Sequence, residues 1–376
     1  MTKSNKNIYF YPQKIGFGCY LLGTAVFHFL LKTIWGKALT AILFLAAIAV
    51  FLVVEMGPGK FPANQSLTLR VPAGAHFRQI ADSLRNGGLL KNRTLFLAIG
   101  RITGKDKNVR AGLFEIPGGL NAWQLLNYLE TAPAKRFKVT LTEGILSYKM
   151  AAILQKRIGV DSTQFVDLVY DSSLARSFAP EAPNLEGYLQ PETYFFEWKT
   201  GAKRVIQRLV SRTLHIFEPD SVQFRMKQLG WNRREVLTLA SIIEGEAVVD
   251  SERAIISSLY HNRLRLGWPL QADPTIQFAI PGPPRRLLNK DLEFDSPYNT
   301  YKYKGLPPGP INNPGRRSIL AALFPRRTSY LYMVAIGDGR HKFSRTLREH
   351  NRWHARFNEI RRKNRRTRKR LRRGSG

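Results

Sequence analysis

An uncharged apolar run at residues 38–54, ALTAILFLAAIAVFLVV, constrains the fold of this chain more than any other feature. As a helix its 17 residues span roughly 26 Å, close to the hydrocarbon thickness of about 30 Å. Residues 1–37 carry five lysines and no acid, so the positive-inside rule places them in the cytoplasm. Because no small-residue cleavage pattern follows, we predict a retained, single-pass transmembrane helix at residues 38–57, with everything after it outside the cytoplasm.

A second apolar stretch at residues 15–31 competes for insertion, and two spans would return the carboxyl terminus to the cytoplasm. A first helix here would force the loop with Lys32 and Lys37 across the membrane. Its Gly, Tyr, Phe and His content also suits the membrane interface better. We therefore expect one span, with residues 1–37 as a basic cytoplasmic and interfacial segment.

The charge balance is strongly basic, with 59 Lys and Arg against 27 Asp and Glu and a formal net charge of +32 at pH 7. This balance predicts an anionic partner or surface. Ten positive charges lie in RRKNRRTRKRLRR, part of an Arg-rich tail at residues 352–376 that is too polar and self-repelling to enter a core.

Cys19 is the only cysteine, which excludes an internal disulfide and a multi-cysteine metal site. His350 and His354 share a helix face, but the arginines beside them argue against a metal site.

Patterning after the apolar run predicts a mixed α+β protein with two folded parts. Residues 66–131 alternate short strands with amphipathic helices and form a small αβ subdomain. The boundary tetrapeptide Thr-Ala-Pro-Ala follows, and a larger domain covers residues 135–351. Within it, LEGYLQPETYFF at residues 185–196 is either the wall of a groove or a buried hairpin.

Two glutamates, Glu244 and Glu246, interrupt the largely apolar run LTLASIIEGEAVVDSERAIISSLYHNR. On a helix both fall on faces that carry aliphatic side chains, so both are expected to be partly buried. A carboxyl group held against aliphatic side chains has a raised pKa and keeps a proton near neutral pH, which is the profile of a general acid. The alternative is a pair of helix-end carboxylates that are solvated or paired with Arg253 or Arg263, and this stretch alone favours that alternative.

The polar loops that follow are rich in proline and glycine, and they predict fixed turns that present Asp273, Thr275, Tyr298 and Asn299. The chain has no GxSxG nucleophile elbow and no GxxxxGK[ST] phosphate loop. One reaction type compatible with the sequence is that of a two-carboxylate glycosidase, which would pair Glu246 with an acid of these loops. A second compatible reaction uses one carboxyl group, which protonates a glycosidic oxygen and then deprotonates a hydroxyl of the same sugar, so that no water attacks.

Several separated motifs point to one family. They are ASIIEGEAVVDSERAIISSLYHNRLRLGWPLQADPT, then SPYNTYKYKGLPPGPINNPG, then YLYMVAIGDGRHKFSRTLREHN, with weaker matches at TEG and EGYLQPETY. In this order they closely resemble the endolytic murein transglycosylases, the MltG or YceG-like family, over residues 66–351.

The resemblance implies an activity and a location. It implies a lyase that cleaves peptidoglycan between N-acetylmuramic acid and N-acetylglucosamine and leaves 1,6-anhydro ends, without metal or cofactor. It also implies a LysM-like subdomain at residues 66–131 and anchorage in the bacterial cytoplasmic (inner) membrane. The expected partners are peptidoglycan glycan strands, membrane lipid and peptidoglycan synthases. The alternatives are a muramidase-type hydrolase, or a tethered binder of anionic polymer or nucleic acid, and the predicted topology argues against nucleic acid.

Carried over position by position, the resemblance assigns catalysis to Glu246, the second residue of the Glu-x-Glu pair, and a supporting role to Glu244. Gly245 stands between them, where the family commonly has a longer side chain. The resemblance also places around the groove a set of residues expected to bind substrate: Asn262, Arg263, Gln271, Asp273, Thr275, Tyr298 and Asn299.

Overall fold

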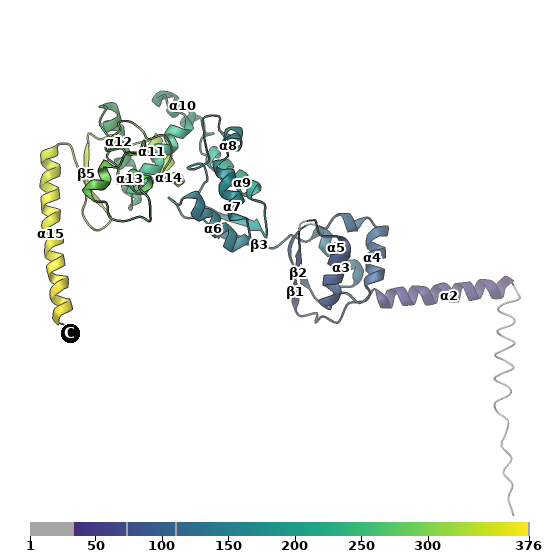
Figure 1. Ribbon diagram of the computed structural model, residues 1–376. Helices are drawn as coiled ribbons and strands as arrows, with labels where there is room; N and C mark the ends of the chain where they lie inside the picture. The colour runs from purple at the N-terminus through teal and green to yellow at the C-terminus, as the bar shows by residue number, and fades with distance from the viewer. Residues whose placement is uncertain (1–33, 73, 110, 375–376) are drawn as a thin grey trace, which may run out of the picture. The chain divides into compact units, whose positions relative to one another are not determined.

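The computed structural model describes residues 34–72, 74–109 and 111–374 of the chain. Its architecture is mixed α+β, as the patterning predicted. The chain divides into two compact units, Met1–Lys135 and Arg136–Gly376 (Figure 1). Each unit has its own cluster of buried apolar side chains.

The apolar run forms one helix, α2, over Ile34–Glu55. From Trp35 to Glu55 this helix is long and apolar enough to cross a membrane, and its most apolar window is not buried inside the structure. Among the described residues it is the one helix with this property. The predicted apolar helix is therefore confirmed, whereas the competing stretch at residues 15–31 and Cys19 lie outside the described residues.

The first unit inserts two helices between two antiparallel strands. β1 (Ser66–Val71) pairs with β2 (Gly112–Pro117), and Leu69 lies opposite Phe114. Alternate strand residues face the core because successive side chains of a strand point to opposite faces. Besides α2, the α-helices described in this unit are α3 (Phe77–Asn86), α4 (Arg93–Ile102) and α5 (Ala122–Thr131).

The second unit contains two separate antiparallel strand pairs among its helices. β3 (Arg136–Thr140) pairs with β4 (Thr193–Glu197), and β5 (Tyr332–Ala335) pairs with β6 (His341–Ser344). Its helices are α6 (Ser147–Ile158), α7 (Ser162–Tyr170), α8 (Ser172–Phe178), α9 (Ala202–His215), α10 (Asp220–Leu229), α11 (Arg233–Glu246), α12 (Arg253–Arg265), α13 (Asp273–Ala279), α14 (Arg316–Leu323) and α15 (Leu347–Gly374).

One of these helices begins inside a segment that the sequence predicts as a loop. α13 starts at Asp273, within the QADPT motif, and carries a proline in its first turn. Proline is tolerated there because its missing N–H would have no partner inside the helix. The polar loop is therefore shorter than predicted, and Asp273 lies at a helix start.

α11 is the buried centre of the second unit. Its cap Asn232 accepts a hydrogen bond from the Glu235 backbone N–H, and the Glu235 carboxylate accepts one from the Asn232 N–H. This reciprocal pair fixes where the helix begins. Every residue at positions 236–243 is buried, so the helix has no solvent face along that stretch. Because the helix ends at Glu246, both glutamates lie in its last turn.

Asn313 joins three segments of the second unit. Its side-chain nitrogen donates to the Ile145 carbonyl at 3.0 Å and to the Glu186 carboxylate at 2.6 Å. Its side-chain oxygen accepts from the backbone N–H groups of Gly187 and Leu189 at 2.8 and 3.0 Å. Gly187 has a φ of +87°, a left-handed conformation that glycine adopts without a Cβ clash. Asn313 thereby fixes the TEG and EGY turns to the loop that precedes α14.

The aromatic segment at residues 185–196 is largely buried, but its strand β4 pairs with the distant strand β3 and not with a neighbouring segment, as the hairpin alternative would require. Tyr188, Tyr194 and Phe196 are buried in the core of the second unit. Only the outward-facing Phe195 of its strand β4 is largely exposed among these aromatic residues. Most of this aromatic density therefore packs inside the unit.

The last helix includes most of the Arg-rich tail. α15 runs from Leu347 to Gly374 and so covers the predicted tail of residues 352–376 as far as Gly374. Arginine and lysine are good helix formers and the segment contains no proline, so helical propensity outweighs the repulsion between like charges. The first turns of α15 lie against the β5–β6 hairpin, where the His350 ring is 5.5 Å from that of Tyr332.

Candidate active site

The two glutamates at the end of α11 have different surroundings. The Glu244 side chain is buried, pairs with the Arg253 guanidinium at 3.0 Å and accepts the Gly315 backbone N–H at 2.9 Å. Arg253 is held in addition by Asp250, at 3.1 Å. The ion-pair alternative from the sequence therefore describes Glu244, whose carboxylate ties α11 to the starts of α12 and α14.

Among the residues that the structure describes, no basic side chain forms an ion pair with Glu246. Its Oε1 atom accepts a hydrogen bond from the Tyr260 hydroxyl of α12 at 3.0 Å. Burial of the carboxyl group, with a smaller contribution from the nearby Asp273 carboxylate, raises the pKa of Glu246 to about 7. Tyr260 and the Arg263 charge oppose this shift only in part. Near neutral pH the group therefore populates both its protonated and its charged form.

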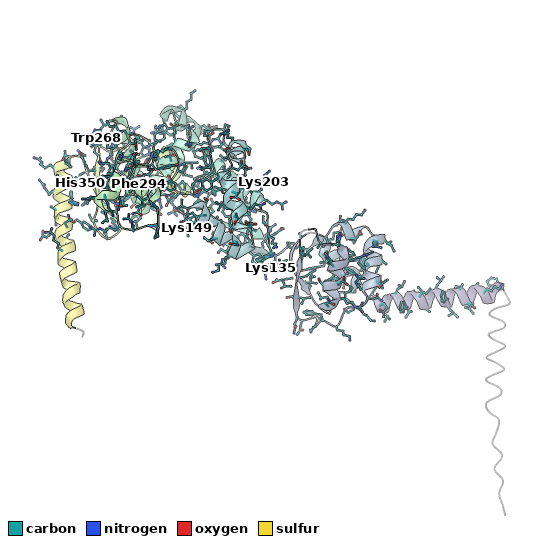
Figure 2. The ribbon with its side chains drawn as sticks, in the orientation of Figure 1. Lys135, Lys149, Lys203, Trp268, Phe294 and His350 are labelled. Carbon is teal, nitrogen blue, oxygen red and sulfur yellow. The ribbon has the colours of Figure 1, made fainter. Side chains whose placement is uncertain are left out.

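Two cavities meet at Glu246 and Asp273. The first, of about 370 Å³, is lined by the β5 residues Tyr332 and Met333 and is called the β5 cavity here. The second, of about 390 Å³, is lined by Lys149 at the start of α6 and is called the α6 cavity. His350 borders the β5 cavity, and Figure 2 labels both His350 and Lys149 on the second unit.

Gly245 permits the close packing that brings Glu246 and Asp273 together. A Cβ atom at this position would lie 2.7 Å from the Cβ of Pro274, which is too short for a real contact. Pro274 is the second residue of α13, directly after Asp273. The glycine between the two glutamates therefore allows α13 to approach the end of α11.

Three of the residues predicted to bind substrate line the β5 cavity. They are Arg263, Gln271 and Asp273. The Arg263 guanidinium is fixed by the carbonyls of Leu331 and Leu270, at 2.8 and 2.6 Å. The Tyr301 hydroxyl donates to Asp273 at 2.5 Å. The structure thus gathers these three predicted side chains around Glu246 and holds two of them in place.

Three other predicted residues are buried and bind backbone groups instead of lining either cavity. Asn262 donates to the carbonyls of Thr328 and Tyr330, at 2.9 and 3.0 Å. Thr275 donates to the Ala272 carbonyl at 2.7 Å. Asn299 donates to two carbonyls of the preceding turn and accepts from the backbone N–H two residues ahead. The Thr275 and Asn299 contacts hold the segments that carry Asp273 and Tyr301, and the Asn262 contacts hold the segment that leads to β5.

Tyr298 lies in a separate small cavity of about 130 Å³. This cavity also contains Glu186, whose carboxyl group is buried and accepts hydrogen bonds from Ser147, Tyr170 and Asn313. Burial raises the pKa of Glu186, while these donors oppose the rise. The structure therefore does not bring Tyr298 into the cavities that contact Glu246.

Sequence reasoning missed several side chains that contact the site. Tyr260 bonds the carboxyl group of Glu246, and Tyr301 bonds Asp273. Tyr332, His341 and His350 line the β5 cavity, although they lie far from Glu246 in sequence. Tyr260 and Tyr301 stand inside motifs that the sequence singled out, but only tertiary contacts identify their partners.

The scaffold and the site together define a class of protein, one that combines an apolar helix of membrane length with a buried acid. The chain is an α+β protein with a membrane-length apolar helix and a desolvated carboxyl group, of the kind used as a general acid, at the junction of two cavities. The sequence model of the YceG-like family matches residues 69–356, and the chain belongs to this family.

Characterised relatives carry one name. The chain is 32% identical over 310 residues to the endolytic murein transglycosylase of Bacillus subtilis, which covers 78% of this chain and 85% of the relative. It is 26% identical over 325 residues to the enzyme of that name from Streptococcus pneumoniae, and this match spans 58% of the relative's length. The crystal structure of a putative yceG-like protein from Listeria monocytogenes covers 77% of this chain and 98% of its own, with 31% identity and a TM-score of 0.53.

The contacts of Glu244 predict a structural role that can be separated from Glu246. We expect Glu244→Gln to lower the free energy of unfolding by about 1–3 kcal/mol, because a buried ion pair is lost while Asp250 still holds Arg253. The titration of Glu246, followed by NMR of a labelled carboxyl group, should remain centred near 7. Urea denaturation measures the stability change.

The matched control for this variant is Glu143→Gln. Glu143 lies 3.6 Å from the same Arg253 guanidinium, but its side chain is 40% exposed, so its loss should cost less than about 0.5 kcal/mol. Equal losses from the two variants would contradict the assignment of Glu244 as the buried partner.

Proposed function

We propose that this protein is a lytic transglycosylase that cuts inside peptidoglycan glycan strands, with Glu246 as its single acid and base. The observation that carries the proposal is the position of Glu246, a buried carboxyl group with a raised pKa where two cavities meet. Membership of a family whose characterised relatives are named endolytic murein transglycosylase supports the same substrate class.

The reaction requires one proton transfer in each direction. Protonated Glu246 gives its proton to the oxygen that links N-acetylmuramic acid to N-acetylglucosamine, and the bond from that oxygen to C1 breaks. The resulting carboxylate then takes the proton of the C6 hydroxyl on the same muramic acid. As this proton leaves, the C6 oxygen bonds to C1. The products are a free hydroxyl on one sugar and a 1,6-anhydro ring on the other. Because nucleophile and electrophile share one sugar, positioning supplies much of the rate.

The neighbours of Glu246 fit both halves of this cycle. Burial keeps the acid protonated near neutral pH, so it is ready to donate. After donation, the Tyr260 hydroxyl and the positive charge of Arg263 stabilise the carboxylate. The Tyr260 bond also fixes the orientation of the carboxyl group about its own axis.

The two cavities support cleavage within a strand. The β5 cavity and the α6 cavity extend from Glu246 through different sets of residues. A strand that occupies both would place a sugar on each side of the scissile bond, as an internal cut requires. Lys149 on one side and Arg263 on the other would meet the acidic and polar groups of the strand, together with Gln271.

The anchor and the first unit extend the proposal beyond chemistry. The lysines at residues 1–37 support a cytoplasmic location for that segment, and the second unit then acts outside the cytoplasmic membrane. There it meets nascent strands beside the synthases. The strand–helix–helix–strand order of the first unit supports a LysM-like subdomain.

Product analysis tests the reaction itself. We expect purified protein to release glycan fragments with 1,6-anhydro muramic ends, identified by mass spectrometry. Glu246→Gln should lower the rate by at least about 100-fold, because general acid–base catalysis contributes that much or more. The control Glu218→Gln changes an exposed carboxylate and should leave the rate unchanged. Reducing muramic ends would instead indicate a muramidase-type hydrolase.

The pH profile tests the assignment of the acid. Since the protonated form must react, kcat/KM should be constant below about 7 and fall roughly tenfold per pH unit above it. Asp273→Asn removes a charge that raises the pKa of Glu246, so its descending limb should move to lower pH. An unshifted limb in this variant would contradict the electrostatic coupling between the two groups.

Reporter fusions test the orientation of the anchor. A periplasmic-type phosphatase joined to the carboxyl terminus should be active, and a fluorescent protein that folds only in the cytoplasm should stay dark at that position. The matched pair, fused before residue 34, should give the reverse pattern. Cytoplasmic fluorescence from the carboxyl-terminal fusion would overturn both the topology and the role in the cell wall.

A further inference from the structure

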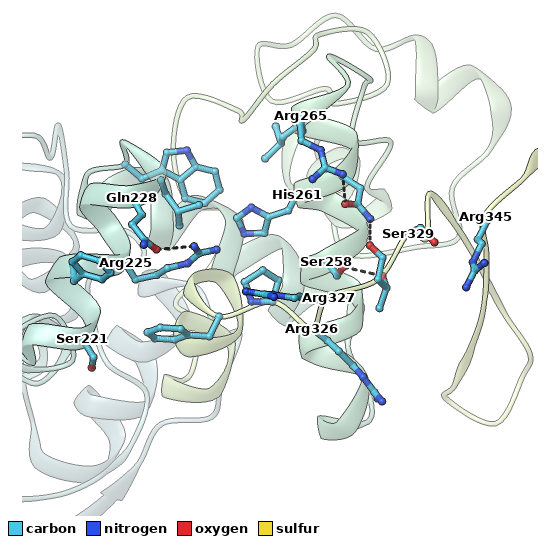
Figure 3. Close-up of a pocket in the computed structure, with 18 residues that line it drawn as sticks. Ser221, Arg225, Gln228, Ser258, His261, Arg265, Arg326, Arg327, Ser329 and Arg345 are labelled. Carbon is cyan, nitrogen blue, oxygen red and sulfur yellow. Dashed lines mark hydrogen bonds between the residues drawn. The ribbon is translucent and has the colours of Figure 1, made fainter.

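A large basic groove lies on the second unit, apart from the cavities at Glu246. Its volume is about 1260 Å³, and its walls come from α10, α12, the segment that follows α14 and the residue Arg345 beyond β6 (Figure 3). We call it the basic groove. Its charged lining residues are Arg225, Arg265, Arg326, Arg327 and Arg345.

The groove collects positive charge without compensation. Five arginines line it and no carboxylate does. Arg225 and Arg265 bond neutral acceptors, the Leu323 carbonyl at 2.7 Å and the Asn262 side chain at 3.1 Å. Arg326 and Arg327 are exposed, and their side chains have no bonding partner within the part of the chain that the structure describes. Guanidinium groups that lack a carboxylate partner favour phosphate, which they bind through two parallel hydrogen bonds.

Aromatic surfaces accompany these charges. Phe224 is 64% exposed and Phe324 is 45% exposed, although both are large apolar side chains. The Trp231 ring stacks on His261 with centroids 5.0 Å apart, which holds it rigidly in the wall. Exposed aromatic rings beside arginines suit a ligand that alternates carbon-rich sugar or polyol units with phosphates.

The contacts of the groove disfavour an extended peptide and a bilayer. A peptide that adds a strand needs free backbone groups, but Asn262 occupies the carbonyls of Thr328 and Tyr330 along this wall. A lipid surface is met by a flat or convex patch, whereas these residues surround a hollow. A flexible polyanion can enter such a hollow and satisfy several arginines at once.

Helix α12 separates this groove from the proposed active site. Ser258, His261 and Arg265 face the basic groove, whereas Leu259 and Arg263 face the β5 cavity. At about 100° per residue these two sets occupy different sides of one helix. A ligand in the groove therefore need not compete with a strand at Glu246.

We propose that the basic groove binds a phosphodiester polymer with sugar or polyol units. Such a ligand would hold the protein beside anionic polymer of the cell envelope while the β5 and α6 cavities hold the glycan strand. This polymer would be an anionic partner of the kind that the net charge of +32 predicts.

The test uses the full chain in nanodiscs of phosphatidylcholine and fluorescent poly(glycerol phosphate) as the probe. We expect binding that weakens steeply with salt, because phosphate contacts release counterions. The double variant Arg326→Glu, Arg327→Glu should weaken it by at least about tenfold. Both side chains are exposed, so folding and glycan cleavage should be unchanged.

The matched control reverses the same number of charges at Lys156→Glu, Arg157→Glu. These adjacent residues are exposed in α6 and line no part of the groove. Affinity should fall less than about twofold, and equal losses in the two double variants would overturn the proposal. So would equal competition by monomeric glycerol phosphate at the same phosphate concentration. If nanodiscs of phosphatidylglycerol abolish the difference between wild type and the groove variant, lipid headgroups fill the groove and the polymer proposal is wrong.

Discussion

The proposed chemistry depends on the burial of α11. Its residues 236–243 are enclosed on every side, so the first polar groups after them lie at the junction of the core and the cavities. Desolvation there raises the pKa of Glu246 from 4.5 to about 7. The folded protein therefore binds this proton more tightly than the unfolded chain, and the contribution of Glu246 to stability falls as pH rises between those values. A core that ends in a carboxyl group thus exchanges some stability for an acid that works near neutrality.

The surrounding contacts keep the two glutamates in separate roles. Arg253 and the Gly315 backbone N–H bind the Glu244 carboxylate, while Glu246 accepts the Tyr260 hydrogen bond and lies near the Asp273 carboxylate. The close approach at Gly245 and Pro274 places Asp273 where its charge can act. One side of the α11 end is therefore a structural junction, and the other is the proposed place of proton transfer.

α12 connects the parts of the second unit that bear on function. It supplies Tyr260 and Arg263 to the site and His261 and Arg265 to the basic groove. Between them, Asn262 fixes the segment that leads to β5. The six-residue stretch YHNRLR is thus divided among the candidate active site, the scaffold and a charged surface according to the direction in which each side chain leaves the helix.

The sequence by itself determined the apolar helix, the α+β character and the motifs around Glu246, because local hydrophobicity and short-range periodicity are properties of contiguous residues. It also named Arg263, Gln271 and Asp273, which the structure gathers beside Glu246. It did not separate these from Asn262, Thr275 and Asn299, since a buried amide or hydroxyl that bonds a backbone carbonyl looks the same in a motif as one that faces a ligand. The sequence predicted the segment after residue 351 as a tail outside the core, and its helicity follows from the high helix propensity of arginine and lysine. Only the tertiary structure decided which glutamate meets Arg253, which tyrosine bonds the acid and where the arginines converge, because those partners lie on segments that folding alone brings together.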